Sequence, residues 1–281
     1  MKAKNHSTDL PKPLNILALG AGVQSTVLAL MSEKGELPKV DGAIFADTGG
    51  EPKSVMKHLD WLESQLTYPV YRVMEKEGLT KAIYDAVEDK TKRLSAPPFY
   101  TKGEKSAVGK LFRVCTSEYK IKPVIKKIRE LLGLKKGERA GKEVRVIQWF
   151  GISYDELQRM KESKHKWLRN YYPLIEKKIT RQDCLNWMQR NGYPEPPRSA
   201  CTYCPYHSDS FWRTMKYEDT ESWTDAVNID HAIRGGIKGT VNELYLHKSL
   251  QPLDEVKFED EYHPDQETFN FGDECEGMCG N

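Results

Sequence analysis

Long hydrophobic runs are missing from this 281-residue sequence, in which 30% of the residues are charged. No apolar stretch approaches the roughly 18 residues of a membrane-spanning helix, and residues 1–13 are polar, without the apolar core of a signal peptide. These absences argue against a membrane or secreted protein, so we expect a cytoplasmic protein without membrane contact. Internal repeats are missing as well, which argues against a repeat architecture.

Cysteine is scarce, with six residues in the chain, and in the cytosol such residues more often serve metal or redox chemistry than disulfides. One CxxC pair is present, Cys201 and Cys204, directly ahead of Pro205. No second CxxC lies nearby, so a local four-cysteine zinc ribbon is not formed. The pair is compatible with a metal ion, an iron–sulfur cluster, a redox pair or two buried thiols.

A large net charge is missing too, because 43 Lys and Arg nearly balance 41 Asp and Glu. The charges are nonetheless unevenly distributed. Residues 90–142 contain 16 basic residues and 4 glutamates, whereas residues 254–281 contain 10 acidic residues and one lysine. A basic body with an acidic tail suggests an anionic ligand such as a nucleotide, sulfate or nucleic acid. We call residues 90–142 the basic segment and expect it to contact that ligand.

Short apolar runs alternate with helical patterns along the chain. We predict strands over residues 15–19, 42–46, 68–73 and 144–152, and helices over residues 26–34, 54–66, 119–132 and 181–190. The stretch from Thr202 is first rich in cysteine and aromatic residues and is then expected to be helical to about Arg234. This alternation predicts an α/β fold with a Rossmann-like, doubly wound parallel sheet. Residues 89–110 have no regular pattern and are expected to form a mobile loop or lid.

Three regions follow from this pattern. We expect a nucleotide-binding α/β domain over residues 1–175, with the basic loop 89–142 inserted into it. A helical, cysteine-bearing region over residues 176–252 would bind a metal or cluster. Residues 253–281 would form an acidic, flexible tail that includes Cys275 and Cys279.

A glycine-rich turn joins the first predicted strand to the first predicted helix, over residues 20–26. Gly20 and Gly22 permit a tight backbone turn, and Ser25 and Thr26 add hydroxyl groups at the start of the helix. Such a turn directs backbone N–H groups toward an anion, although many strand–helix turns use glycine for purely structural reasons. The turn lacks the lysine of a Walker loop and is not a clean dinucleotide fingerprint.

Two further strand ends carry polar residues. Asp47, Thr48 and Gly49 follow the second predicted strand, and residues 153–156 follow the last one. Because ligands of doubly wound sheets sit at the carboxyl ends of adjacent strands, these ends are expected to surround one crevice.

Together these motifs resemble the adenine nucleotide α-hydrolase-like (PP-loop ATP pyrophosphatase) superfamily, in its phosphoadenylyl-sulfate (PAPS) reductase branch. The resemblance spans residues 14–212, and its segments are residues 19–25, 45–49, 113–123, 151–159 and 173–194. Two departures lie in the loop, where Gly20 replaces the usual serine and Gln24 the usual aspartate. Gln24 carries no charge, but phosphate binding by such a loop is mostly a backbone property.

The resemblance implies ATP and Mg²⁺ as cofactors and assigns residues to them. The nucleotide would be bound by Gly20, Ala21, Gly22, Gln24, Ser25, Thr26, Asp47, Thr48, Gly49, Arg113, Gly151 and Glu156. Ser25, Lys120 and Arg159 would be catalytic, with Lys110 as a further candidate for contacts to phosphate or substrate.

The cysteine pattern is similar to that of the iron–sulfur sulfurtransferase of DNA phosphorothioation. This resemblance implies a four-iron, four-sulfur cluster held by Cys115, Cys184, Cys201 and Cys204. The alternative is Zn²⁺ with His207 as a possible ligand. Cys275 and Cys279 are expected to lie outside the cluster.

Three functions remain open from the sequence. The first is adenylylation of a substrate with pyrophosphate release, coupled to iron–sulfur-dependent sulfur transfer or to modification of a nucleic acid or base. Its partners would include a sulfur donor protein, and DNA or tRNA bound through the basic segment. The second is a thiol reductase similar to PAPS reductase, which would require Cys275 or Cys279. The third is a nucleotide- or nucleic-acid-binding module with a structural metal and no turnover.

Overall fold

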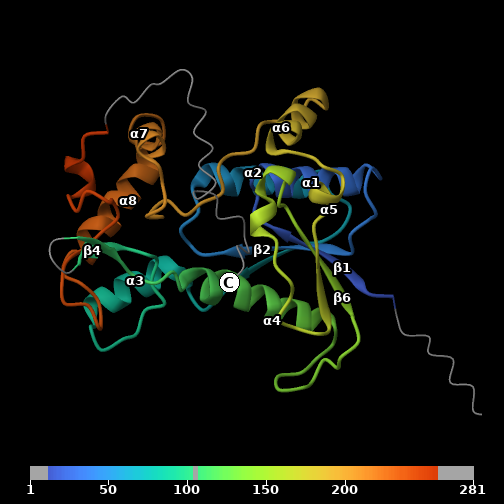
Figure 1. Ribbon diagram of the computed structural model, residues 1–281, viewed down its shortest axis with the longest axis horizontal. Coiled ribbons are helices and arrows are strands. Elements are labelled where there is room, and N and C mark those ends of the chain that lie inside the picture. Colours follow the sequence, from blue (N-terminus) through green and yellow to red (C-terminus); the bar gives the residue numbers. More distant parts are fainter. Residues whose placement is uncertain (1–11, 104–106, 259–281) are drawn as a thin grey trace, which may run out of the picture.

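A parallel five-stranded sheet forms the centre of the computed structural model, which describes residues 12–103 and 107–258 (Figure 1). The strand order is β3-β2-β1-β6-β7, and every neighbouring pair is parallel. The strands are β1 (Leu14–Leu19), β2 (Gly42–Asp47), β3 (Val70–Met74), β6 (Val146–Phe150) and β7 (Leu168–Tyr171). This topology confirms the predicted Rossmann-like α/β fold.

Helices cover both faces of this sheet (Figure 1). On one face lie α1 (Val23–Glu33), α2 (Lys53–Ser64), α5 (Pro173–Glu176) and α6 (Arg181–Arg190). On the other face lies α4 (Lys122–Leu131), preceded by the single π-helical turn Ser117–Ile121. Alternate residues of β1 serve the two cores, because Leu17 packs beneath α1 whereas Ile16 packs beneath α4 with Ile128.

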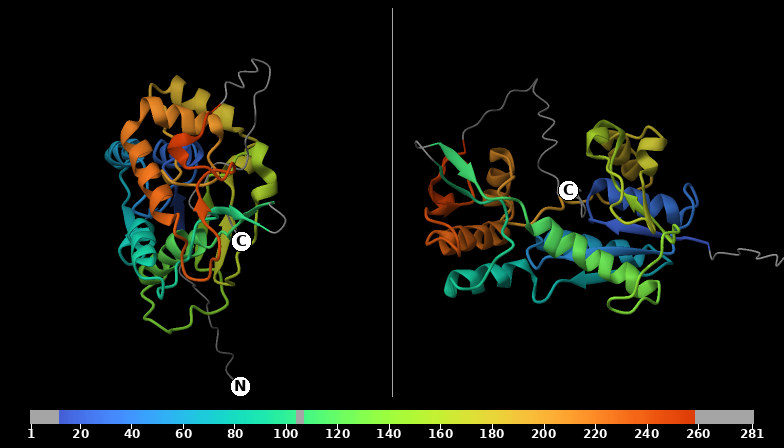
Figure 2. Two further views of the ribbon diagram at one scale, coloured as in Figure 1. Left: turned by 90° about the vertical axis from the view of Figure 1, so that its left-hand side faces the viewer. Right: turned by 60° about the horizontal axis from the view of Figure 1, so that its bottom comes forward.

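A second apolar core lies at one end of the molecule, where α3 (Gly78–Glu88), α7 (Asp209–Glu218) and α8 (Thr220–Ile233) come together (Figure 2). Trp212 and Ile233 are fully buried in this core. A small antiparallel sheet covers it, with strand order β5-β4-β8. Its strands are β4 (Tyr100–Lys102), β5 (Val108–Lys110) and β8 (Leu244–Tyr245). Residues far apart in sequence therefore share this core.

Several local features differ from the sequence-based expectations. The predicted loop 89–110 contains the strands β4 and β5, and the helical stretch predicted to end near Arg234 is divided at Asp219 into α7 and α8. The helix predicted over residues 119–132 is confirmed as α4, which lies within the basic segment and packs on the main sheet. The proposed boundaries near residues 175 and 252 stay predictions. None of the helices in the described part of the chain is long and apolar enough to cross a membrane.

Candidate functional site

The turn between β1 and α1 presents the N-terminus of a helix at the carboxyl edge of the sheet. Ala21 has a left-handed backbone (φ 58°), and Gly22 precedes the helix in an extended conformation. Thr26 N–H donates the first helical hydrogen bond, to the Gly22 carbonyl at 3.0 Å. The N–H groups of the helical residues before Thr26 have no helical carbonyl to bond, and no described side chain caps them. A helix start of this kind attracts anions.

The hydroxyl groups of this turn serve its own structure. Ser25 Oγ accepts from Gly20 N–H and donates to the Gly22 carbonyl, both at 3.3 Å, and Ser25 is buried. Thr26 Oγ1 bonds His58 Nε2 at 3.0 Å, and burial lowers the pKa of His58 to about 4. Both hydroxyls therefore bond within the protein, and their contacts to a ligand stay a prediction.

The end of β6 packs tightly against the first turn of α1. A Cβ atom on Gly151 would lie 2.6 Å from Ser25 N and 3.0 Å from the Gln24 carbonyl carbon, so only glycine fits there. Gln24 Nε2 donates to Ser153 Oγ at 3.4 Å and to Glu156 Oε2 at 3.2 Å. Close backbone packing and side-chain bonds thus join the loop to the neighbouring strand.

Glu156 is held on two sides. It accepts from Gln24 on α1 and forms an ion pair with Arg159, with both carboxylate and guanidinium mostly buried. Gln24 Oε1 is buried and has no hydrogen-bond partner among the described residues. Gln24, Glu156 and Arg159 therefore form a continuous polar chain from the loop to the segment after β6.

The end of β2 forms a second polar cluster beside the loop. Asp47 Oδ1 accepts from Gly49 N–H at 2.7 Å, and Glu51 accepts from Thr48 N–H at 3.0 Å. Burial raises the pKa of Glu51 to about 7, and the nearby charge of Lys120 opposes this shift. Glu51 was missed by the sequence analysis, because no spacing rule marks a carboxylate that folds back on its own strand end.

Three cysteines line one small pocket at this strand end. Cys115, Cys201 and Cys204 share it with Lys120 and Arg113, and its volume is about 30 Å³. We call this the thiol pocket. Thr48, from the end of β2, also lines it, and its Oγ1 lies 3.2 Å from Cys201 Sγ. The structure thus brings together the predicted cysteine and basic residues of two distant segments.

Burial dominates the chemistry of the thiol pocket. It raises the pKa of the Cys201 thiol well above its ordinary value, and the charge of Glu51 adds to that effect. Lys120 opposes both, because its positive charge favours the thiolate. Burial therefore favours the neutral thiol of Cys201 over its thiolate.

Cys184 does not join the other three cysteines. It is fully buried in the core beneath α1, on the same face of α6 as Trp187 and Met188. A four-cysteine ligand set is therefore not assembled, and the cluster expected from the sequence does not fit these residues. Within residues 12–103 and 107–258, no three His, Cys, Asp or Glu side chains are grouped so that they could hold a metal ion. Cys275 and Cys279 lie outside the described residues.

His207, the alternative zinc ligand, contacts the backbone of the CxxC turn and two aromatic rings. Its Nε2 lies 2.8 Å from the Cys201 carbonyl oxygen, and its ring packs against Phe211 and Trp212. Burial lowers the pKa of His207 to about 3, so the ring is neutral. His207 supports the backbone of the CxxC turn.

A tyrosine couples the CxxC turn to the end of β2. A Cβ atom on Gly50 would lie 2.4 Å from Tyr203 Oη, and Thr202 N–H donates to the Gly50 carbonyl at 2.8 Å. Tyr203 Oη also bonds Thr80 Oγ1 at 2.8 Å. The Gly-Gly doublet after β2 was the available sequence signal for this close approach.

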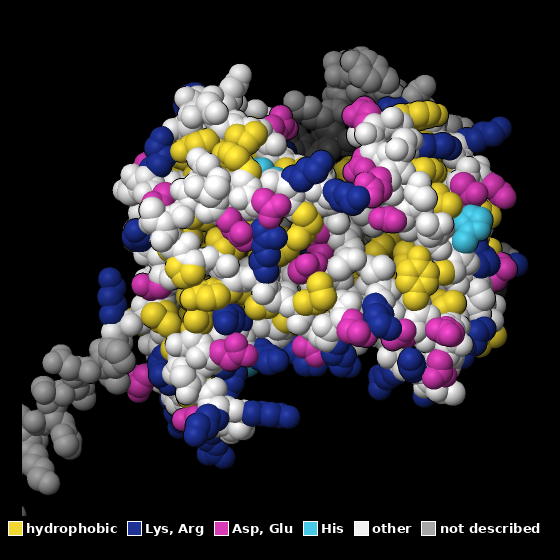
Figure 3. Space-filling view, turned by 180° about the vertical axis from the view of Figure 1, so that it is seen from behind, with side chains coloured by type: hydrophobic (Ala, Val, Ile, Leu, Met, Phe, Trp, Pro, Cys, Tyr) yellow, Lys and Arg dark blue, Asp and Glu magenta, His cyan; other side chains and the backbone are white. Residues whose placement is uncertain are grey.

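Several cations of the basic segment contact other side chains of the protein. Lys110 and Arg113 both lie over the ring of Tyr206, at 4.9 and 5.5 Å from its centroid. Lys122 forms ion pairs with Glu75 and Glu118. On the face shown in Figure 3, Lys and Arg side chains are interspersed with Asp and Glu. The nucleic-acid interface stays a prediction.

Comparisons with known proteins identify no family for this chain. No family model matches the sequence, and no curated protein matches it. Among solved structures, the chain is similar to the phosphate complex of phosphoadenylyl-sulfate (PAPS) reductase from Candida auris. The identity is 13% and the TM-score 0.41, over 67% of this chain and 76% of that chain. A likeness of this size identifies no substrate, and the fold assignment rests on the sheet topology.

Proposed function

We propose that this chain is an ATP-binding enzyme of the PP-loop type, which adenylylates an acceptor and releases pyrophosphate. One observation carries the proposal. The start of α1, with its Gly-rich turn, and the thiol pocket lie at the carboxyl ends of the neighbouring strands β1 and β2. Ligands of parallel sheets bind at such adjacent strand ends.

The phosphates would bind to the backbone N–H groups at the start of α1. Ser25 holds this loop in shape, while Gly151 allows β6 to approach it. An acceptor oxygen attacks the α-phosphorus, the bond from that phosphorus to the bridging oxygen breaks, and pyrophosphate leaves with the electron pair. Catalysis of this kind rests on positioning and on charge stabilisation. Mg²⁺ would neutralise phosphate charge, and Asp47 offers a carboxylate for it.

The thiol pocket would carry the second half of the reaction. A sulfur donor protein would load one of the three cysteines with a terminal sulfur, as a persulfide. The terminal sulfur attacks the activated carbon, the carbon–oxygen bond breaks and AMP leaves, so that a disulfide joins the cysteine to the acceptor. The thiolate of a second cysteine then attacks the sulfur of the first, the thiolated acceptor leaves with the electron pair, and an external thiol reductant reduces the disulfide left between the two cysteines. Lys120 would stabilise the attacking thiolate, because its charge already opposes the rise in the pKa of Cys201. The acceptor is proposed to be a base or nucleotide, and the basic segment to contact its phosphates.

A nucleotide-binding module without turnover is the second candidate, and Gln24 favours it. This residue replaces the usual aspartate of the loop and its amide is already bonded to Glu156. A neutral, engaged side chain does not help to organise a metal-bound triphosphate.

Pyrophosphate release distinguishes the two candidates. Purified protein would be incubated with ATP, Mg²⁺ and separate pools of nucleosides, nucleotides, tRNA and DNA, with and without a sulfide source. Release that depends on one pool supports the enzyme. Tight ATP binding without release from any pool would favour the binding module.

A further inference from the structure

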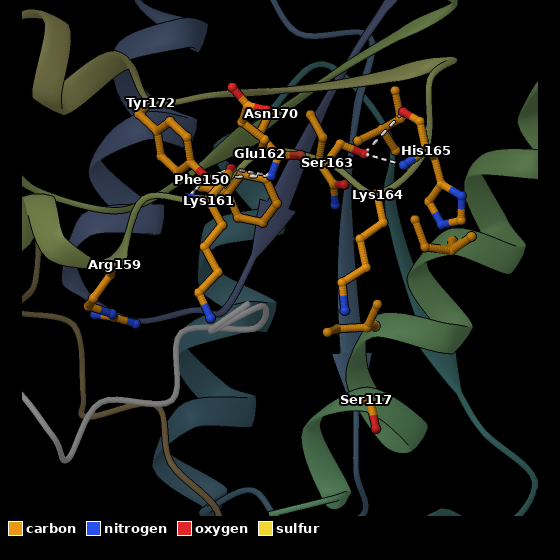
Figure 4. Close-up of a pocket in the computed structure, with 14 residues that line it drawn as sticks. Ser117, Phe150, Arg159, Lys161, Glu162, Ser163, Lys164, His165, Asn170 and Tyr172 are labelled. Atoms are coloured by element: carbon orange, nitrogen blue, oxygen red, sulfur yellow. Dashed lines mark hydrogen bonds between the residues drawn. The ribbon is translucent and has the colours of Figure 1, made fainter. Parts of the chain in front are cut away.

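A second pocket lies between α4 and the β6–β7 side of the main sheet, and the phosphate loop does not account for it (Figure 4). Its volume is about 180 Å³. Gln148 of β6 pairs in register with Ile16 on one side and Asn170 on the other, so the three share the sheet face that α4 covers. Ser117 lines the pocket from the side of α4. We call this cavity the Gln148 pocket.

The side chain of Gln148 is the unusual feature of this pocket. It is fully buried, and neither Nε2 nor Oε1 has a hydrogen-bond partner among the described residues. Buried amides are normally bonded, because an unpaired donor or acceptor loses its hydration without compensation. Ile16, which pairs with Gln148 in the adjacent strand, packs in the apolar core on the same face of the sheet, so an apolar side chain can be accommodated there. An amide retained here points to a polar partner that enters the pocket.

The rest of the pocket combines an aromatic wall with cations. Phe150 and Tyr172 stack with ring centroids 5.6 Å apart and 27° between their planes. The side chains of Lys161 and Lys164 extend in the same direction across the pocket (Figure 4). Tyr172 Oη donates to the Lys161 carbonyl at 2.6 Å, which fixes the segment that closes the pocket. The two rings and the backbone at Lys161 are therefore held in place by the fold.

We propose that the Gln148 pocket binds a nucleobase whose phosphate contacts Lys161 and Lys164. A glutamine amide presents one donor and one acceptor in a plane, which matches the paired edge of a base. Aromatic faces stack on bases, and lysines bind phosphate. The volume is below the ~300–1,000 Å³ of pockets for drug-sized ligands, so it suits a single base.

This assignment deepens the proposed function, since the bound base would belong to the acceptor. Arg159 lines the Gln148 pocket and pairs with Glu156, which accepts from Gln24 of the phosphate loop. The polar chain of these three side chains thus connects the two sites. The base could come from a mononucleotide or from a nucleotide within a strand, because both offer the same chemistry.

Binding measurements on the full chain test the proposal. Calorimetric titrations would use the four nucleoside monophosphates, the matching nucleosides and short single-stranded oligonucleotides. Wild type should bind one base in preference. Gln148→Leu should weaken that binding at least tenfold, whereas Gln189→Leu, an exposed glutamine on α6, should not. Lys164→Ala should weaken binding of the monophosphate and leave that of the nucleoside unchanged.

The thermal midpoint of the unliganded protein gives an independent readout. Gln148→Leu should leave it unchanged or raise it, because leucine removes an unpaired amide at similar volume. A lower midpoint would mark the amide as structural, bonded to ordered water, and would overturn the proposal. So would equal nucleotide affinity of Gln148→Leu and wild type, or no binding of any nucleotide, nucleoside or oligonucleotide.

The remaining outcomes distinguish a mononucleotide from a base within a strand, and this pocket from the proposed adenylylation. An oligonucleotide that displaces the monophosphate supports a base within a strand, and a failure to displace it supports a mononucleotide. Base binding that depends on Gln148, without pyrophosphate release, would keep this pocket and reject adenylylation. Pyrophosphate release with an acceptor that Gln148→Leu binds normally would keep adenylylation and reject this pocket.

Discussion

Replacement of Gly151 by alanine tests whether close packing of β6 against the phosphate loop matters. The added methyl group would lie 2.6 Å from Ser25 N, 2.9 Å from Ser25 Cα and 3.0 Å from the Gln24 carbonyl carbon. All three atoms belong to the backbone, so no side chain can rotate away. The end of β6 and the first turn of α1 must therefore separate.

The size of the effect follows from this overlap. Extra methyl groups in well-packed regions cost about 1–3 kcal/mol, and contact with backbone on one side favours the upper part of that range. Each kcal/mol lowers the thermal midpoint of a domain of this size by roughly 2–4 °C. Because the N–H groups at the start of α1 shift as well, ATP affinity should fall about tenfold, or ~1.4 kcal/mol.

Thermal unfolding and ATP titration of Gly151→Ala would measure both effects. Gly235→Ala is the matched control, because its nearest neighbour would be the Lys90 ammonium at 3.8 Å. Only Gly151→Ala should lose stability and ATP affinity together. Equal behaviour of the two variants would refute the close-packing argument.

Three further predictions concern single side chains. Ser25→Ala removes both loop hydrogen bonds, so the free energy of ATP binding and the free energy of unfolding should each fall by about 1 kcal/mol. Calorimetry would measure the first and denaturant titration the second, and an unchanged ATP affinity would show that this loop does not bind the nucleotide. Because the pKa of His58 falls from 6.5 unfolded to about 4 folded, wild type should lose up to about 3 kcal/mol of stability as pH drops through that window. Denaturant curves of His58→Gln should show no such loss of stability at low pH. If the stability of His58→Gln fell with pH in parallel with wild type, the assignment to His58 would be contradicted. Because the described cysteines do not form a ligand set, anaerobically purified wild type should contain no stoichiometric iron or zinc by metal analysis and visible spectroscopy; bound metal that is lost in Cys184→Ser would restore the four-cysteine set.

The main sheet could be predicted because its central strands are continuous apolar runs. β1 and β2 are buried on both faces, and α6 begins at a capping box formed by Thr180 and Asp183. β7 was missed because it is an edge strand with one buried residue, Leu168. α3 was missed as well: no helix was predicted between the third strand and residue 89, where the structure has one.

The candidate site was predicted in part. Strand-end reasoning placed the loop, Asp47 and Glu156 at one edge, because parallel strands end together. The direction of individual side chains could not be derived, so the inward bonds of Ser25 and the unpaired amide of Gln148 were not foreseen. For Cys184 a signal existed: its spacing to Trp187 and Met188 marks the buried face of a helix.

Comparison of ATP with adenosine tests the central claim most directly. The claim is that the backbone at the start of α1 binds phosphate, which predicts that the triphosphate supplies most of the affinity. In calorimetric titrations at constant salt, ATP should bind at least tenfold more tightly than adenosine, and pyrophosphate should compete with it. Equal affinity for ATP and adenosine, or ATP binding that pyrophosphate does not reduce, would contradict the account.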